Sequence, residues 1–271
     1  MLAKTIRNLS FLLSSILSLL SVTVSFCFAS PNANELLSRK GFVFKSAVTE
    51  HFRLHFEPNT LAEDRLEDLK LWQEKAFARN LQLLKVTNYL SQTDIFIVAS
   101  RERMKKLIGD ETNGVAYPDT KVVCFIFNER INASGSHELM HVMARNAWNI
   151  KPKAWIGEGL AVYADDIWGN YQLHDLSKYF LQEKKLIPLE KLIENFGGYS
   201  DLATYPQAGS FVKYLYEQYG ADKVRMLWSS GTVKDLKRVL GKDVPTLEKE
   251  WHSKLTEADA SKVKYEFPVN K

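Results

Sequence analysis

The chain has 271 residues, of which 45% are hydrophobic and 25% are charged. A chain of this length can bury a sizeable core as one large domain or two small ones, and its composition excludes an intrinsically disordered protein. The formal net charge is only +4. This charge is too small to favour nucleic acid or an anionic membrane surface as a partner.

The first 29 residues have a composition of their own. Lys4 and Arg7 precede a long uncharged stretch, and Cys27-Phe28-Ala29 offers small residues at the two positions that a signal peptidase reads. We therefore predict a cleaved signal peptide over residues 1–29 and an exported protein, secreted or periplasmic. An uncleaved membrane anchor is the alternative, because the uncharged stretch is nearly long enough to cross a bilayer.

Cleavage at this point would remove two basic and no acidic residues, so the net charge would fall from +4 to +2. It would also leave Cys124 as the only cysteine, which excludes an intrachain disulfide. Because Cys124 lies in an apolar run, we predict that it is a buried small hydrophobe.

Residues 41–127 carry the patterns of a mixed strand-and-helix unit. Alternating apolar and polar residues predict strands, and apolar residues at helical spacing predict helices. Tyr117-Pro118-Asp119-Thr120 predicts a hairpin turn, because Pro favours the φ that a turn needs. The expected elements are strands at 41–46, 51–58 and 93–100, helices at 61–84 and 101–109, and a hairpin at 114–127.

From residue 131 onward the pattern is helical, with Gly or Pro at each break. The expected helices lie at 131–146, 154–168, 173–185, 188–196, 205–220, 232–241 and 244–255. This order predicts an α+β fold with a cleft between two lobes. We expect an N-terminal lobe of mixed sheet and helices (30–146), an all-helical lobe (147–256) and a poorly ordered tail (257–271).

The segment "SHELMHVM" places His137 and His141 four residues apart, with Glu138 directly after the first histidine. On a helix, residues at this spacing project from one face, so both imidazoles can converge on one zinc ion. Glu138 points elsewhere and can accept a proton from the water that the ion activates. The alternative is an ordinary amphipathic helix with three polar residues.

A catalytic zinc needs a third protein ligand. Glu158 lies in "WIGEGLAVYA", a run that is otherwise apolar, and a buried carboxylate there would be costly unless it were paired or bound to a metal. The interval between His141 and Glu158 contains Pro152 and is long enough for a second helix to return. We therefore predict a zinc site formed by His137, His141 and Glu158.

These motifs resemble those of the gluzincin metallopeptidases, in particular the secreted peptidase-MA-like families. There an HExxH helix is followed by a W-x-x-E-G-x-A signature, which corresponds here to Trp155 through Ala161. The resemblance covers roughly residues 50–220 and extends to the hairpin at 114–127 and the helix at 205–220. It implies a zincin-like fold, one Zn²⁺ per chain, a peptide or protein substrate and an edge strand beside the site.

The chain lacks residues that two related groups of metallopeptidases require, and this excludes metzincins and argues against an aminopeptidase. The metzincin pattern requires Gly at 144 and His at 147, and both positions are Ala. Aminopeptidases of the gluzincin type carry a G-x-M-E-N strand whose Glu holds the substrate amine. The corresponding segment, Gly114 to Tyr117, has no acid. We therefore favour an endopeptidase.

Two further residues are candidates for supporting roles. Asp165, two turns after Glu158, could hold the distal nitrogen of a zinc-bound histidine, or it could be a solvated residue near a helix end. Tyr205, predicted in the first turn of a helix begun by Pro206, could donate to the developing oxyanion, or it could be structural. His51 and His55 are predicted to be structural or exposed, and His174 and His252 to lie at the surface.

The sequence thus predicts an exported zinc metallopeptidase with Glu138 as general base and acid. One rival is a zinc-binding module of the same fold with negligible proteolysis, against which the intact Glu138 argues. The other is a zinc-free helical scaffold, in which an isolated Glu158 would have no role. Substrate identity and oligomeric state do not follow from the sequence.

Overall fold

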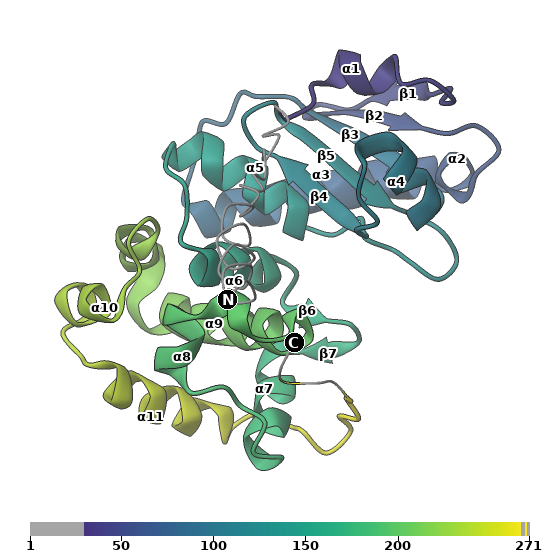
Figure 1. The fold of residues 1–271 in the computed structure, drawn as a ribbon. Coiled ribbons are helices and arrows are strands. Elements are labelled where there is room, and N and C mark those ends of the chain that lie inside the picture. Colours follow the sequence, from purple (N-terminus) through teal and green to yellow (C-terminus); the bar gives the residue numbers. More distant parts are fainter. Residues whose placement is uncertain (1–29, 267–268, 270–271) are drawn as a thin grey trace, which may run out of the picture.

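The computed structural model describes residues 30–266 and residue 269. A five-stranded sheet with flanking helices, α5 among them, forms the upper part in Figure 1, helices α7 to α11 form the lower part, and α6 lies between them. This arrangement confirms the predicted α+β fold. The helices of the upper part and the junction are α1 (Ala33–Leu37), α2 (Leu61–Asp64), α3 (Leu66–Leu84), α4 (Arg101–Ile108), α5 (His137–Trp148) and α6 (Ala154–Asp165).

The sheet has the strand order β1-β2-β3-β5-β4. The central pairs β2–β3 and β3–β5 are parallel, whereas the outer pairs β1–β2 and β4–β5 are antiparallel. This topology leaves β4 at the edge that lies beside α5. The strands are β1 (Lys45–Val48), β2 (Phe52–Phe56), β3 (Thr93–Val98), β4 (Gly114–Tyr117) and β5 (Val122–Ile126).

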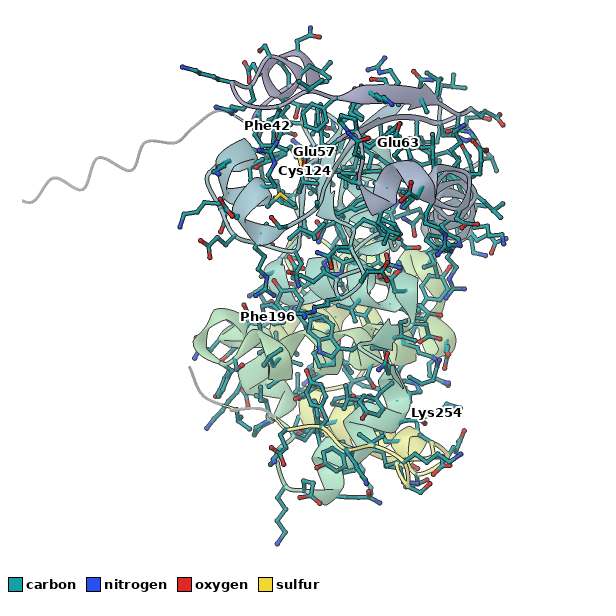
Figure 2. All side chains as sticks on the ribbon, turned by 90° about the vertical axis from the view of Figure 1, so that its right-hand side faces the viewer. Phe42, Glu57, Glu63, Cys124, Phe196 and Lys254 are labelled. Atoms are coloured by element: carbon teal, nitrogen blue, oxygen red, sulfur yellow. The ribbon has the colours of Figure 1, made fainter. Side chains whose placement is uncertain are left out.

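Side chains along the central strands point alternately to the two faces of the sheet, and each face packs into a different hydrophobic core. On β3, Ile95 and Ile97 join the main core, while Phe96 and Val98 join a smaller core beneath α1 and α4. Cys124 is fully buried in the smaller core, as predicted, and it lies within the sheet-bearing part in Figure 2. Because both faces of the sheet are covered, β3 and β5 are buried along their whole length.

The helical part completes the main core. The tightest approach joins α6 to α9, where a Cβ on Gly159 would lie 2.6 Å from Val212 and 2.8 Å from the carbonyl of Ala208. Only a residue without a side chain fits between these helices. The remaining helices are α7 (Leu173–Gln182), α8 (Leu189–Glu194), the 3₁₀ turn η1 (Phe196–Gly198), α9 (Asp201–Leu227), α10 (Val233–Leu240) and α11 (Val244–Leu255).

Several local predictions were wrong. The helix expected at 131–146 begins only at His137, and the strand expected at 41–46 lies at Lys45–Val48. The helix expected at 61–84 is two helices, because Arg65 has non-helical dihedral angles (φ −109°, ψ 27°). The helix expected at 154–168 ends at Asp165, and a short hairpin follows, formed by β6 (Ile167–Trp168) and β7 (Tyr171–Gln172). Helix α9 begins at Asp201 rather than at Pro206.

The C-terminal segment is placed against the body of the protein, contrary to the poorly ordered tail that we predicted. Trp168 Nε1 donates to the Tyr265 hydroxyl at 2.7 Å, and the Tyr171 hydroxyl donates to the carbonyl of Lys264 at 2.9 Å. The Tyr265 hydroxyl also lies 3.5 Å from the carbonyl of Leu202. That carbonyl would otherwise lack a partner, because Pro206, four residues on, has no N–H.

The remaining histidines are more buried than the sequence suggested. His55 is buried and contacts Asp94 and Ser46, so it is structural, as predicted. His174 and His252 are partly buried rather than at the surface. Nδ1 of His174 is hydrogen-bonded to the hydroxyl of Ser210 at 2.8 Å. The helices of the described residues include none that is long and apolar enough to span a membrane. The signal peptide predicted over residues 1–29 lies outside the described residues.

Candidate metal centre and active site

The start of α5 is fixed by buried polar side chains from other elements. Asn80 of α3 donates to the carbonyl of Ser136 at 3.2 Å, and Gln73 of the same helix donates to the carbonyl of Ser134. Asp165, at the end of α6, accepts from the amide of Ser136 at 2.5 Å. These contacts hold the segment before His137, because buried backbone groups are costly to leave without partners.

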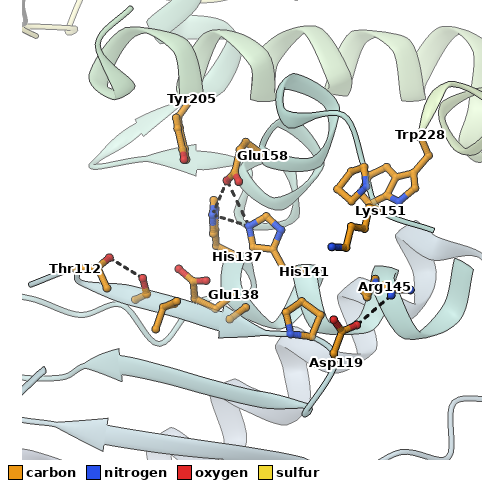
Figure 3. Close-up of a pocket in the computed structure, with 15 residues that line it drawn as sticks. Thr112, Asp119, His137, Glu138, His141, Arg145, Lys151, Glu158, Tyr205 and Trp228 are labelled. Carbon is orange, nitrogen blue, oxygen red and sulfur yellow. Dashed lines mark hydrogen bonds and ion pairs between the residues drawn. The ribbon is translucent and has the colours of Figure 1, made fainter. Parts of the chain in front are cut away.

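Three predicted ligand residues converge above α5. His137 and His141 project from one face of this helix, and Glu158 reaches them from α6 (Figure 3). The Nε2 atoms of the two histidines lie 3.2 Å apart. Oε2 of Glu158 lies 3.4 Å from Nε2 of His137 and 3.3 Å from Nε2 of His141.

These distances fit a tetrahedral zinc site. Ligand atoms about 2.05 Å from a zinc ion at tetrahedral angles lie about 3.3 Å from one another. The three edges of the observed triangle are 3.2, 3.3 and 3.4 Å. Two imidazoles and a carboxylate leave the fourth position open, which is the donor set of a catalytic rather than a structural zinc site.

The charges around the triangle also suit a dication. Burial acts to raise the pKa of Glu158, but hydrogen bonds and charge interactions with His137 and His141 outweigh it and hold this pKa below its usual range. Burial acts to lower the pKa of His137, but Glu158, Glu138 and Asp165 outweigh it and raise this pKa. Glu158 is therefore anionic at neutral pH and gives the ligand set a negative charge.

Glu138 lies close to both imidazoles without being the third corner of the triangle. Ligand-type atoms of Glu138, His137 and His141 all lie within 4.8 Å of one another. Its carboxylate also lies against the backbone of β4, where a Cβ on Gly114 would come within 2.7 Å of Oε1. We take Glu158 rather than Glu138 as the third ligand, because only its distances to both imidazoles match the tetrahedral edge.

Tyr205 approaches the triangle from the opposite side, on α9 (Figure 3). Its ring stacks near His137, with 6.3 Å between ring centroids, and it also contacts Trp168 and Phe196. Burial, together with the charge of Glu158, raises the pKa of the Tyr205 hydroxyl. The hydroxyl therefore stays protonated at neutral pH and is available as a hydrogen-bond donor.

The cleft extends on both sides of these residues. One part, of about 610 Å³, runs from Glu138 past His141 to Trp228. The other part, of about 1030 Å³, runs from Glu138 to Trp72 and Trp168. Gly114 and Tyr205 line both parts. The edge strand β4 thus borders a continuous groove with the predicted metal ligands near its middle.

Comparison with known proteins identifies the family. Residues 79–257 match the model of the peptidase MA superfamily, which is more than half of the chain. The chain therefore belongs to the peptidase MA superfamily, and this confirms the gluzincin resemblance drawn from its motifs. The match also extends past residue 220, where the motifs gave no guidance. Among proteins of curated function, none matches the sequence.

Two solved structures show a weak likeness. Native leukotriene A4 hydrolase from Saccharomyces cerevisiae is 13% identical, with a TM-score of 0.34, and the match covers 83% of this chain and 40% of that one. An aminopeptidase N family protein from Idiomarina loihiensis is 16% identical, with a TM-score of 0.28, and the match covers 80% and 42%. The chain spans less than half the length of either structure, so neither likeness carries an argument about activity.

The predictions from sequence differ from the structure mainly for the residues that surround the three predicted ligands and Glu138. The structure places Asp165 against the amide of Ser136 rather than against an imidazole, so its contact is with the start of α5. Gln73 and Asn80 were missed, although a signal exists: both are polar residues within the buried stripe of α3. In the sequence, Gly114 drew attention only as part of a segment that lacks the Glu of aminopeptidases. Its contact with Glu138 joins β4 to α5, and local sequence does not predict such a tertiary contact.

Proposed function

We propose that this protein is an exported, zinc-dependent metallopeptidase that cleaves internal peptide bonds and binds one Zn²⁺ per chain. The observation that carries the proposal is the triangle of His137, His141 and Glu158, with edges of a tetrahedral zinc site. Membership in the peptidase MA superfamily supports it. The substrate would be a peptide or a protein.

Each side chain at the centre has a distinct part. When bound, zinc supplies Lewis-acid chemistry that makes a water nucleophilic near neutral pH and polarises the peptide carbonyl. Glu138 accepts a proton from the attacking water and delivers it to the leaving amine. Tyr205 donates a hydrogen bond to the oxyanion. Strand β4 holds the substrate backbone as an added strand.

Two features support internal cleavage. The groove continues on both sides of Glu138, so a chain can extend in both directions. In addition, the part beyond His141 is lined by Arg145 and Lys151. Arg145 pairs with Asp119 at 3.1 Å, which leaves Lys151 as the cation that would repel a substrate amino terminus, whereas an aminopeptidase needs an acid to hold it.

A zinc-binding module without proteolysis is the alternative. It would keep the three ligands, but it would have no use for Glu138 beside them. Export is proposed from the sequence of residues 1–29 alone. The alternative is that this segment is not cleaved and anchors the exported protein in the membrane. Cell fractionation and N-terminal sequencing of the purified protein would separate these two locations.

The proposal is tested by zinc analysis and a broad peptide library. The purified protein should contain about one zinc per chain. Wild type should cleave library peptides at internal bonds, and Glu138→Gln should keep zinc but lose nearly all cleavage, because an amide cannot take the proton. Zinc without cleavage in both proteins would favour the binding module. Absence of zinc after reconstitution would end the metallopeptidase proposal.

A further inference from the structure

Two cationic side chains line the part of the cleft beyond His141. Arg145, one turn further along α5, lies 3.1 Å from Asp119 and also donates to Asn149 at 3.0 Å. Lys151 lies in the loop between α5 and α6, and no carboxylate of the described residues lies within ion-pair distance of its amino group. Figure 3 shows this amino group directed toward the space beside His141. This part of the cleft therefore contains one cation, Lys151, that has no ion-pair partner among the described residues.

The opposite part of the cleft is also lined by cations: Lys75, Arg79 and Arg130. The guanidinium of Arg79 lies 5.6 Å from the centre of the Tyr163 ring, which fixes its position. The described residues place no carboxylate within ion-pair distance of any of the three. Three acids line the same part: Glu138 beside the imidazoles, Asp165, which accepts from the amide of Ser136, and Asp201 at the start of α9. Both parts of the groove thus contain cations that have no ion-pair partner among the described residues.

The direction of a bound peptide follows from Glu138 and Gly114. The Glu138 carboxylate lies against Gly114, at the first residue of β4. Because Glu138 protonates the leaving amine, the C-terminal product begins beside Gly114, and we place it along the part of the groove that Arg130 lines. The N-terminal product then lies beside Tyr117, toward Lys151. In this placement the peptide runs antiparallel to β4, which is one of the two orientations in which a strand can add to a sheet edge.

We infer that the cleft selects extended peptides that carry acidic side chains on both sides of the cleaved bond. This inference rests on the proposed peptidase function and names its substrate class. Lys151 recognises an acid on the N-terminal side of the bond, and Arg130 with Lys75 recognises an acid on the C-terminal side. Lys75, Arg130 and Lys151 are exposed, so each charge pair with a substrate acid is modest and weakens with added salt.

The test uses one peptide sequence made in four forms: neutral, acidic on the N-terminal side of the bond, acidic on the C-terminal side, and acidic on both sides. Wild type should show a kcat/KM about three- to tenfold higher for each acidic side than for the neutral peptide. Lys151→Met should lose the preference for the N-terminal acid alone, and Arg130→Met the preference for the C-terminal acid alone. Lys249→Met, on the exposed face of α11, is the matched control and should keep both preferences.

Equal kcat/KM for all four peptides would overturn the inference and leave the proposed peptidase function intact. If wild type cleaves none of them, the proposed function fails. Binding of fluorescent forms of the same peptides to zinc-loaded Glu138→Gln then decides the inference by itself. Tighter binding of the acidic forms, lost in Lys151→Met/Glu138→Gln, supports it, and equal binding overturns it.

Discussion

Asp165 Oδ1 accepts a hydrogen bond from the amide of Ser136 at 2.5 Å and thereby joins the end of α6 to the start of α5. The two helices carry all three predicted zinc ligands, with His137 directly after Ser136 and Glu158 two turns before Asp165. The angle at which the helices present their ligands therefore depends on this contact. Space for it is left by Gly135, where a Cβ would come within 2.7 Å of the Asp165 carboxylate.

Asp165→Ala should weaken zinc binding although Asp165 does not belong to the ligand triangle. Loss of the acceptor leaves the Ser136 amide unpaired, which costs about 1–3 kcal/mol of stability. Without this contact the start of α5 can shift and displace His137. We expect zinc affinity to fall about ten- to a hundredfold, which is the usual effect of removing a group that orients a metal ligand. Competition with a chromogenic chelator measures the affinity. Asp166→Ala removes the same charge one residue later, from a pair with Lys213, and should leave zinc affinity unchanged.

Glu158→Ala should leave two protein ligands, too few to hold a catalytic zinc tightly. We expect zinc affinity at least about a hundredfold weaker, with circular dichroism of the metal-free protein unchanged, because the carboxylate contributes little packing. A structure of the zinc-loaded protein in which another side chain occupies the position of Glu158 would contradict the assignment. So would an unchanged affinity in the chelator titration.

Gly114→Ala should reduce turnover without removing zinc. The new methyl group would meet Oε1 of Glu138 at 2.7 Å, so the carboxylate must move away from its place beside the imidazoles. A displacement of about 1 Å can cost on the order of a hundredfold in rate. Steady-state kcat with parallel zinc analysis checks this prediction. Gly197→Ala is the matched control, because nothing lies within 4 Å of a Cβ there.

Tyr205→Phe should lower kcat with little change in KM. The hydroxyl is expected to bind the oxyanion, which exists only during the reaction, so its removal should cost roughly a hundred- to a thousandfold in kcat. The ring, with its contacts to His137, Trp168 and Phe196, would remain in place. Unchanged kcat would show that Tyr205 is only structural.

Asp94 should make folding stability depend on acid pH. Burial acts to raise the pKa of Asp94, but the hydrogen bonds and charge of Arg53 and His55 outweigh it and lower this pKa to about 2. A pKa below the usual value means that ionised Asp94 stabilises the folded state, by about 2 kcal/mol. This contribution is complete above about pH 4, where Asp94 is ionised in the unfolded chain too, and it is lost as the pH falls toward 2.

Urea unfolding of wild type and Asp94→Asn tests this at several pH values. The free energies of unfolding should differ by about 2 kcal/mol at pH 7, and the difference should shrink as the pH falls below about 4. A difference that stayed constant down to pH 3 would show that the charge of Asp94 is not the cause.

The sequence predicts the centre of the site better than its surroundings, for a physical reason. His137 and His141 lie on one helix, so their spacing alone fixes their mutual geometry. Glu158 could be inferred because a carboxylate in an apolar run needs a partner. The contacts of Asp165, Gln73 and Gly114 depend on how α3, β4 and α6 pack against α5, and no local spacing encodes that packing. The order of strands and helices was predictable, because it follows local periodicity.

Boundaries were less predictable, because tertiary contacts decide them. Helix α9 continues upstream of Pro206, and the Leu202 carbonyl that the proline cannot bond lies within 3.5 Å of the Tyr265 hydroxyl. A proline normally marks the first turn of a helix. The contact that compensates for it here comes from a segment that local patterns marked as a tail. The domain limits at 146 and 256 stay predictions.

Tyr265 has a consequence for the biosynthesis of the protein. Its hydroxyl accepts from the Trp168 indole across 97 positions of the chain, and Trp168 packs against Tyr205. At about 5–20 residues per second, synthesis of that interval takes on the order of 5–20 seconds. During this time a nascent chain already contains His137, His141 and Glu158, but it lacks the hydroxyl that accepts from the Trp168 indole beside Tyr205. We expect such a chain to bind zinc before it can hydrolyse peptides, which would protect neighbouring unfolded chains from premature cleavage.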